Sequence, residues 1–180
     1  MRALLCSLLA GVFPALPAAA QSVAYSFEWT GSGGYAMRGA LSFPADLMGA
    51  QRVFEDDVDC FVIEGYRDGQ PIGRWALGML TEETTWFLTF DPVLEEFVVW
   101  GPAAPMPQAW NMDGGGYNCG ADGFGFNIGN AAQDLCLDGD LLVESQVMPA
   151  TPFPAERNDA YPFPADACAG EMLMSALPPE

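Results

Sequence analysis

The feature that most constrains the fold of this chain is a two-residue alternation of apolar and polar side chains that recurs in short segments. Over residues 23–30, large apolar residues alternate with small or polar ones, and residues 35–43 repeat the pattern after the turn sequence Gly-Ser-Gly-Gly. A period of two is typical of a half-buried β-strand. Two such runs around a glycine-rich turn predict an antiparallel hairpin.

Further strands are expected over residues 60–66, 71–80, 84–90, 96–100 and 141–147. No segment has the three-and-four spacing of an amphipathic helix over more than two turns. We therefore predict an all-β fold, an antiparallel β-sandwich resembling a jelly roll, with a closed barrel as the alternative.

Residues 108–140 carry most of the glycine and asparagine residues of the chain, together with two cysteines. Glycine weakens the interior of both helices and strands. We therefore expect a long, structured loop here, cross-linked within itself rather than paired into a sheet.

The first twenty residues indicate a secretory signal peptide. Arg2 precedes an apolar run, and a small-residue segment ends at Ala20, which matches the charged start, apolar middle and A-x-A end of such peptides. The apolar run is too short to span a bilayer. We expect cleavage after Ala20, a secreted or periplasmic location, and no integral membrane segment in the mature chain.

The remaining chain is expected to form one β-sandwich domain, residues 21–147, followed by a proline-rich tail, residues 148–180. We interpret the tail as an extended strap packed on the domain, with Phe153 and Phe163 filling the edge of the core. The alternative is that its repeated Pro-Phe-Pro-Ala sequence binds a partner as a polyproline helix.

Four cysteines remain after the expected cleavage: Cys60, Cys119, Cys136 and Cys168. An even number in an exported chain predicts two disulfides, for which three pairings exist. We favour Cys119 with Cys136, because this pair closes a local loop, and Cys60 with Cys168, which ties the tail to the domain. A zinc site is a weaker alternative, since the chain has neither histidine nor a C-x-x-C motif.

The charge of the chain excludes several functions. The formal net charge is −18, which disfavours nucleic acid and anionic membranes as partners. Without histidine or lysine, the chain cannot form a Ser-His-Asp triad or a Schiff base. Paired carboxylates remain available for glycoside hydrolysis, and the candidates are Glu28, Glu64, Glu95 and Glu96.

The aspartates among the glycines of residues 108–140 suggest a calcium site. Asp113, Asp122, Asp138 and Asp140 are the candidate ligands, with Asn111 and Asp134 as further oxygen donors. Calcium prefers six to eight oxygen ligands, and glycine lets backbone carbonyls turn inward. The alternative is that these aspartates cap turns, since Asp-Gly is ordinary turn chemistry.

Aromatic side chains offer a second kind of site, because glycans stack on exposed rings. Trp29, Trp75 and Trp86 fall in strand patterns and are expected in the core. Trp110 follows a proline-rich linker, and we expect it to be the tryptophan nearest the surface; the alternative is that it anchors the loop.

One pattern over residues 22–146 resembles a known group. Aromatic-rich hairpins precede an Asp-Asp-Val-Asp entry into a Phe-Val-Ile strand, and Gln-Ala-Trp-Asn and Gly-Phe-Gly-Phe-Asn-Ile-Gly-Asn follow before a cysteine and Asp-Gly. This layout is similar to that of small exported bacterial β-sandwich proteins, many of which carry a PEP-CTERM sorting tail and have no assigned activity. The resemblance implies an exported β-sandwich and transfers no site residues; the sorting tail is not found here.

We therefore expect an exported, acidic β-sandwich protein that is non-catalytic and either binds a glycan or another component of the cell envelope, or has a structural role there. The alternatives are a calcium-dependent glycan-binding module and a carboxylate-based glycoside hydrolase.

Overall fold

The computed structural model describes residues 21–121 and 123–168, so the expected signal peptide and Asp122 lie outside the described residues. The strands are β1 (Ser22–Thr30), β2 (Tyr35–Pro44), β3 (Val53–Phe54), β4 (Cys60–Arg67), β5 (Gln70–Ala76), β6 (Thr85–Phe87), β7 (Thr89–Asp91), β8 (Glu96–Phe97), β9 (Gln108–Met112), β10 (Phe124–Ile128), β11 (Gln133–Leu137), β12 (Asp140–Leu141) and β13 (Phe153–Arg157). Short 3-10 helices are η1 (Ala45–Gly49), η2 (Glu55–Asp57), η3 (Leu77–Met79), η4 (Val143–Ser145) and η5 (Ala165–Ala167).

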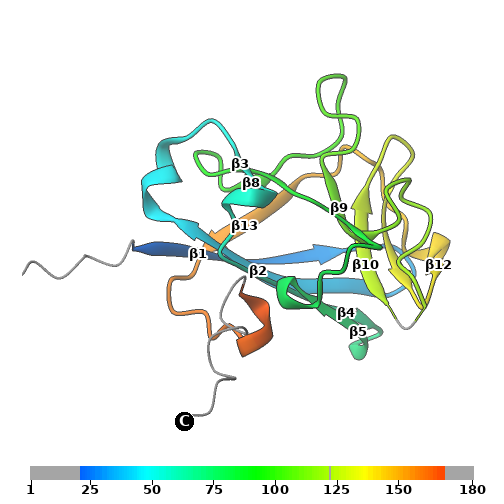
Figure 1. Cartoon of the computed structure of the whole chain (residues 1–180). Helices are drawn as coiled ribbons and strands as arrows, with labels where there is room; N and C mark the ends of the chain where they lie inside the picture. Colours follow the sequence, from blue (N-terminus) through cyan, green and yellow to red (C-terminus); the bar gives the residue numbers. More distant parts are fainter. Residues whose placement is uncertain (1–20, 122, 169–180) are drawn as a thin grey trace, which may run out of the picture.

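The strands form two antiparallel sheets that pack together (Figure 1). The larger sheet has eight strands in the order β3-β7-β8-β13-β1-β2-β4-β5, and the smaller has five in the order β12-β11-β10-β9-β6. The predicted all-β antiparallel sandwich is therefore confirmed. Within the described part of the chain, no helix has the length and apolar character needed to cross a membrane.

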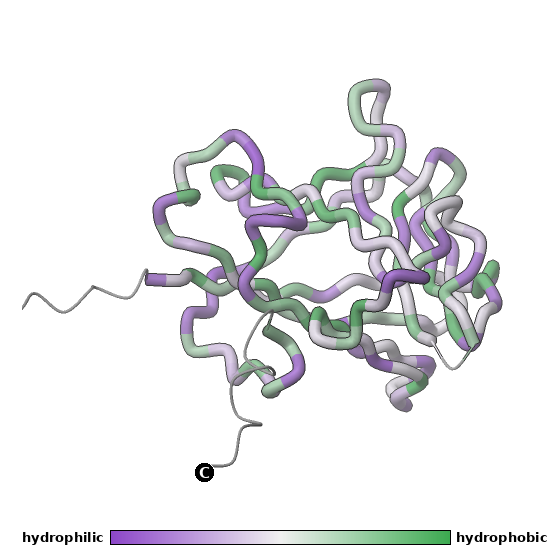
Figure 2. Tube along the Cα trace, in the orientation of Figure 1, coloured by the Kyte–Doolittle hydropathy of each residue, from purple (hydrophilic) through white to green (hydrophobic). Residues whose placement is uncertain are grey.

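The predicted hairpin of β1 and β2 is confirmed along its whole length. Its register runs from Ser22 opposite Pro44 to Thr30 opposite Ala36. Val23, Tyr25, Phe27 and Trp29 are buried, as the alternation predicts for the core face of a strand. Figure 2 shows hydrophobic and hydrophilic residues interleaved along the trace.

Aromatic rings from both sheets fill the space between them. The ring of Trp110, in β9 of the small sheet, lies 4.8 Å from the ring of Phe61 in β4 of the large one. Phe27 makes edge contacts with Phe97 at 4.8 Å and Phe153 at 5.5 Å. Such tilted and edge-to-face pairs are the favoured arrangements of buried aromatic rings, and here they hold the two sheets in contact.

The expectation of a long loop over residues 108–140 is wrong, because β9, β10 and β11 arise within it. The reason is a close approach of backbones at Gly125 in β10. A Cβ atom there would lie 2.7 Å from the carbonyl oxygen of Asn111 and 2.8 Å from that of Trp110. Glycine inside a strand here permits tight pairing rather than preventing it.

Two other strand predictions are corrected. Residues 84–90 do not form one strand: the chain changes sheets at the buried Leu88, between β6 and β7. Residues 141–147 are not one strand: the chain leaves β12 after Leu141, forms η4, and returns at Val147 to a single bridge with Gln133. The hydroxyl of Ser145 accepts the N–H of Leu135 and donates to the carbonyl of Leu142, so a side chain replaces part of the ladder bonding there.

The tail is part of the domain in two ways. Residues 153–157 form β13, which pairs with β1 and β8 inside the large sheet, and Phe153 is fully within the core. The chain then crosses the outer face of that sheet, where Tyr161, Phe163 and Ala167 pack on Val62 and Ala76. Phe163 therefore covers the outer face instead of filling the core edge, and we call residues 158–168 the strap.

Candidate functional site

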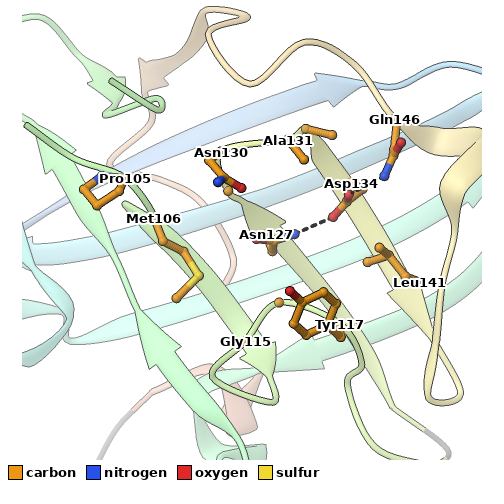
Figure 3. A pocket seen from close by; sticks show the side chains of 13 residues that line it. Pro105, Met106, Gly115, Tyr117, Asn127, Asn130, Ala131, Asp134, Leu141 and Gln146 are labelled. Atoms are coloured by element: carbon orange, nitrogen blue, oxygen red, sulfur yellow. Dashed lines mark hydrogen bonds between the residues drawn. The ribbon is translucent and has the colours of Figure 1, made fainter. Parts of the chain in front are cut away.

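A pocket lies on the outer face of the five-stranded sheet, away from the aromatic core. Its volume is about 320 Å³, at the small end of the range for ligand pockets. The lining includes Met106, Tyr117, Asn127, Asp134, Leu141 and Gln146, together with backbone at Gly115, Gly116 and Gly129 (Figure 3). The pocket therefore combines a few polar side chains with apolar walls and glycine backbone.

The polar floor of the pocket is made by two facing residues of neighbouring strands. Asn127 in β10 lies opposite Asp134 in β11, and their side chains point away from the core because Phe126 and Leu135 point into it. Asp134 is 3% exposed and Asn127 5%. The side-chain amide of Asn127 donates to Oδ1 of Asp134, and Gln146 Nε2 donates to Oδ2 at 3.0 Å.

Asp134 is a buried carboxylate held only by neutral amides. Burial raises the pKa of this carboxyl, and the hydrogen bonds from Gln146 and Asn127 offset the rise only in part. Of the described arginines, four pair with other acids: Arg38 with Glu28, Arg52 with Asp91, Arg74 with Asp166 and Arg157 with Asp159. The fifth, Arg67, lies over the ring of Tyr35, so within the described chain Asp134 has no cationic partner.

One wall of the pocket is the loop after β9, which carries Tyr117. Oδ1 of Asp113 accepts the backbone N–H groups of Gly115 and Tyr117 at 2.9 and 3.0 Å. Burial raises the pKa of Asp113, but these backbone hydrogen bonds outweigh it, and the net pKa lies below the usual value. The loop is thus folded on its own aspartate, and it presents the ring of Tyr117, 75% exposed, beside the pocket.

Both expected disulfides are present, Cys119 with Cys136 and Cys60 with Cys168. The first fastens the Tyr117 loop to β11, two residues beyond Asp134. The second fastens the end of the strap to β4. Sequence spacing alone was enough to favour these two bonds.

The expected calcium ligands are not gathered into one site among the described residues. Asp113 caps its own loop, Asn111 donates its side-chain amide to the carbonyl of Phe124, and Asp138 and Asp140 flank the turn between β11 and β12. No three acidic or cysteine side chains converge within residues 21–121 and 123–168 in a way that would hold a metal. Asp122 lies outside those residues, so the calcium hypothesis stays a prediction.

The expectation that Trp110 lies nearest the surface is wrong, since its side chain is fully buried. Trp110 belongs to β9 rather than to a loop, and its indole N–H donates to Gln108 Oε1 at 3.3 Å. Trp29 and Trp75 are buried, as expected, and Trp86 is partly buried against the core. Sequence reasoning missed Tyr117; its position after three glycines is the signal that marks an exposed loop.

Two of the candidate catalytic glutamates, Glu28 and Glu64, line one further pocket on the large sheet together with Arg38, so the carboxylate-pair hypothesis stays a prediction. Glu28 and Glu64 lie on the outer face of the large sheet, each directly across from Arg38 of the strand between them. Arg38 and Glu28 form an ion pair at 3.5 Å. Glu96 lies in β8, across β13 from β1: it pairs with Pro154, and the next residue, Ala155, pairs with Phe27. Glu95 directly precedes it.

Comparisons of the chain with protein-family models, with curated proteins and with solved structures found no match.

Proposed function

We propose that this protein is an exported, non-catalytic binding protein whose pocket at Asp134 takes a hydroxyl-rich ligand, such as the end of a glycan. A buried carboxylate and carboxamide beside an exposed aromatic ring is the combination that suits a sugar. The polar groups exchange hydrogen bonds with hydroxyls, and the ring covers the apolar face of the sugar. The observation that carries the proposal is the position of Asp134, buried at the floor of an open pocket.

Two features favour binding over catalysis. Of the described residues that line the pocket, Asp134 alone has a carboxyl group, whereas glycoside hydrolysis uses a pair. The side chains at the floor are also fixed to one another, since Asn127 and Gln146 both donate to Asp134. A rigid constellation of this kind suits recognition, because little entropy is lost when the ligand binds.

The two disulfides support export as part of the proposal. Disulfides persist in oxidising compartments and are rare in the cytosol. The first, between Cys119 and Cys136, also belongs to the pocket, because it fixes the loop that carries Tyr117. An exported glycan-binding protein would depend on this bond for its site as well as for its stability.

A glycan array followed by isothermal titration calorimetry tests the proposal. We expect a glycan that binds the wild-type protein to bind Tyr117→Ala about two- to tenfold more weakly, because a stacked ring contributes about 0.5–1.5 kcal/mol. Phe54→Ala is the matched control, since Phe54 is also an exposed aromatic, 50% accessible, outside the pocket. A chelator should leave binding unchanged if calcium has no part in it.

Equal loss of binding in Tyr117→Ala and Phe54→Ala would place the site elsewhere, and an array without any bound glycan would contradict the proposed function. Release of a chromogenic aglycone would favour the hydrolase instead.

A further inference from the structure

The side chain of Asp134 is an acid that forms no ion pair with any cationic side chain of the described chain. Its carboxylate is 3% exposed and receives hydrogen bonds only from two neutral side chains. The chain has no histidine, and all of its cationic side chains are arginines. Moving an ionised carboxylate out of water is costly unless an opposite charge or strong donors meet it.

The floor of the pocket has an acceptor beside its donors, since each side-chain amide has two N–H groups and gives one of them to Asp134. The amide nitrogens of Asn127 and Gln146 are both directed at Asp134. The side-chain oxygen of Asn127 faces the backbone of Gly116 and Gly129, where an added Cβ would lie only 2.9 and 3.3 Å from it. No donor of the described residues makes a hydrogen bond to that oxygen. A ligand that carries donors can bind both this oxygen and the carboxylate of Asp134.

The surroundings also favour positive charge. The protein carries a formal net charge of −18, which attracts cations to open clefts. The described residues that line the pocket include no arginine, and Tyr117 supplies an aromatic ring at its edge. An aromatic face attracts an ammonium group as well as a sugar ring.

We propose that the pocket recognises a protonated primary amine on its ligand, so that amino sugars bind in preference to neutral or acidic ones. An ammonium group has three donors and no acceptor, which matches the carboxylate of Asp134 and the free oxygen of Asn127. This inference rests on the proposed function and narrows its ligand class.

The preference has a pH dependence that follows from the same geometry. The titratable groups of the described lining are Asp134 and Tyr117; Asp113, on the adjacent loop, is turned to its own backbone amides. Burial raises the pKa of Asp134, so Asp134 takes up a proton at a higher pH than an exposed aspartate does. Binding of an ammonium group expels that proton, whereas binding of a neutral sugar does not.

The test compares glucosamine, galactosamine and mannosamine with glucose, galactose and mannose by calorimetry on the disulfide-bonded mature protein. At neutral pH and low salt we expect at least one amino sugar to bind about tenfold tighter than its neutral parent, since a charge-assisted hydrogen bond is stronger than a neutral one. Raised salt should reduce that ratio. Asp134→Asn should bring it close to one.

Asp91→Asn is the control, because Asp91 is also a buried acid, 7% exposed, but pairs with Arg52 outside this pocket. If Asp134→Asn does not fold, the wild-type protein still decides the question. Titrations at mildly acidic pH in two buffers of different ionisation enthalpy should show proton release with the amine and none with the neutral sugar.

Neutral sugars that bind as tightly as amino sugars, with affinity still lost in Tyr117→Ala, would overturn this inference and leave the proposed function standing. A preference that survives in Asp134→Asn would also overturn it. Failure of all six sugars to bind would overturn both.

Discussion

Buried polar side chains form hydrogen bonds with backbone groups that lack a partner in the sheets, and Gln108 is the clearest case. Its side chain is fully buried. Nε2 donates to the carbonyls of Thr89 and Val98, at 2.7 and 2.9 Å, and Oε1 accepts from the backbone of Thr89. One amide thus satisfies backbone groups at the point where the chain passes between the sheets, where ladder bonding is interrupted.

We expect Gln108→Ala to lower the free energy of unfolding by about 2–4 kcal/mol, because it leaves several buried backbone groups without partners. Urea unfolding followed by tryptophan fluorescence would measure this as a lower midpoint at unchanged slope. Gln70→Ala, at an exposed position of β5, should stay within about 0.5 kcal/mol of wild type. Similar losses in both variants would contradict the role given to Gln108.

Asp134 predicts an unusual dependence of stability on pH. Its pKa in the folded protein lies above the ordinary value of 3.8, so the folded state holds this proton more tightly than the unfolded state. Its contribution to stability is therefore greatest below 3.8 and declines as the pH rises through the folded-state pKa.

Asp134→Asn removes this titration. We expect the melting temperature of the variant, relative to wild type, to be higher at neutral pH than at pH about 3. Differential scanning calorimetry gives the difference in melting temperature between variant and wild type at each pH. Comparing the two differences cancels any effect of the substitution that does not depend on pH. A constant offset would mean that Asp134 titrates normally.

At the scale of elements, the sequence predicted the hairpins of the large sheet and missed the three central strands of the small one, β9, β10 and β11. Alternation located β1 and the first half of β2, where buried and more exposed residues take turns, and a β-branched apolar run located β4. β10 and β11 are buried on both faces, because a loop covers the side that carries Asn127 and Asp134. Their sequences therefore do not alternate between apolar buried residues and polar exposed ones. The glycines that permit close pairing at β10 are also typical of loops, so the sequence of this strand predicts a loop.

The candidate site was predictable only in fragments for the same reason. Asp134 was among the oxygen donors singled out, but its neighbour depends on the register of β10 against β11, and register follows from the whole sheet. Tyr117 has no local pattern that distinguishes a pocket wall from an ordinary loop. The disulfides, by contrast, followed from cysteine spacing and the expectation of export.

The two disulfides should contribute to stability according to the chain length that they enclose. The separations are 17 residues for Cys119–Cys136 and 108 for Cys60–Cys168. The loop-entropy relation gives about 3 and about 4.7 kcal/mol. We expect Cys60→Ala with Cys168→Ala to unfold at lower urea concentration than Cys119→Ala with Cys136→Ala, and limited proteolysis to cut the strap in the former only. The reverse order would show that the local bond dominates.

At the scale of the molecule, the net charge of −18 is carried by acids that mostly lack partners, since the described residues contain four ion pairs. Repulsion among them opposes compaction. Salt screens this repulsion over distances of about 10 Å at 0.1 M. Stability should therefore increase with ionic strength.

We expect the melting temperature at neutral pH to rise with sodium chloride, and to rise equally in calcium chloride at the same ionic strength. Screening of the net charge is the cause that the two salts share. An additional rise in calcium that disappears in Asp138→Asn with Asp140→Asn would instead establish the calcium site expected from the sequence.

The position of β13 sets the order in which the molecule can be completed. In the large sheet it lies between β8 and β1, so the strands that precede it in the chain form two groups that residues 153–157 join. A growing chain cannot close its sandwich until nearly all of it has left the ribosome, since long-range pairing waits for the last strand. We therefore expect the large sheet to stay in two separate halves until residues 153–157 have been synthesised and can pair with both.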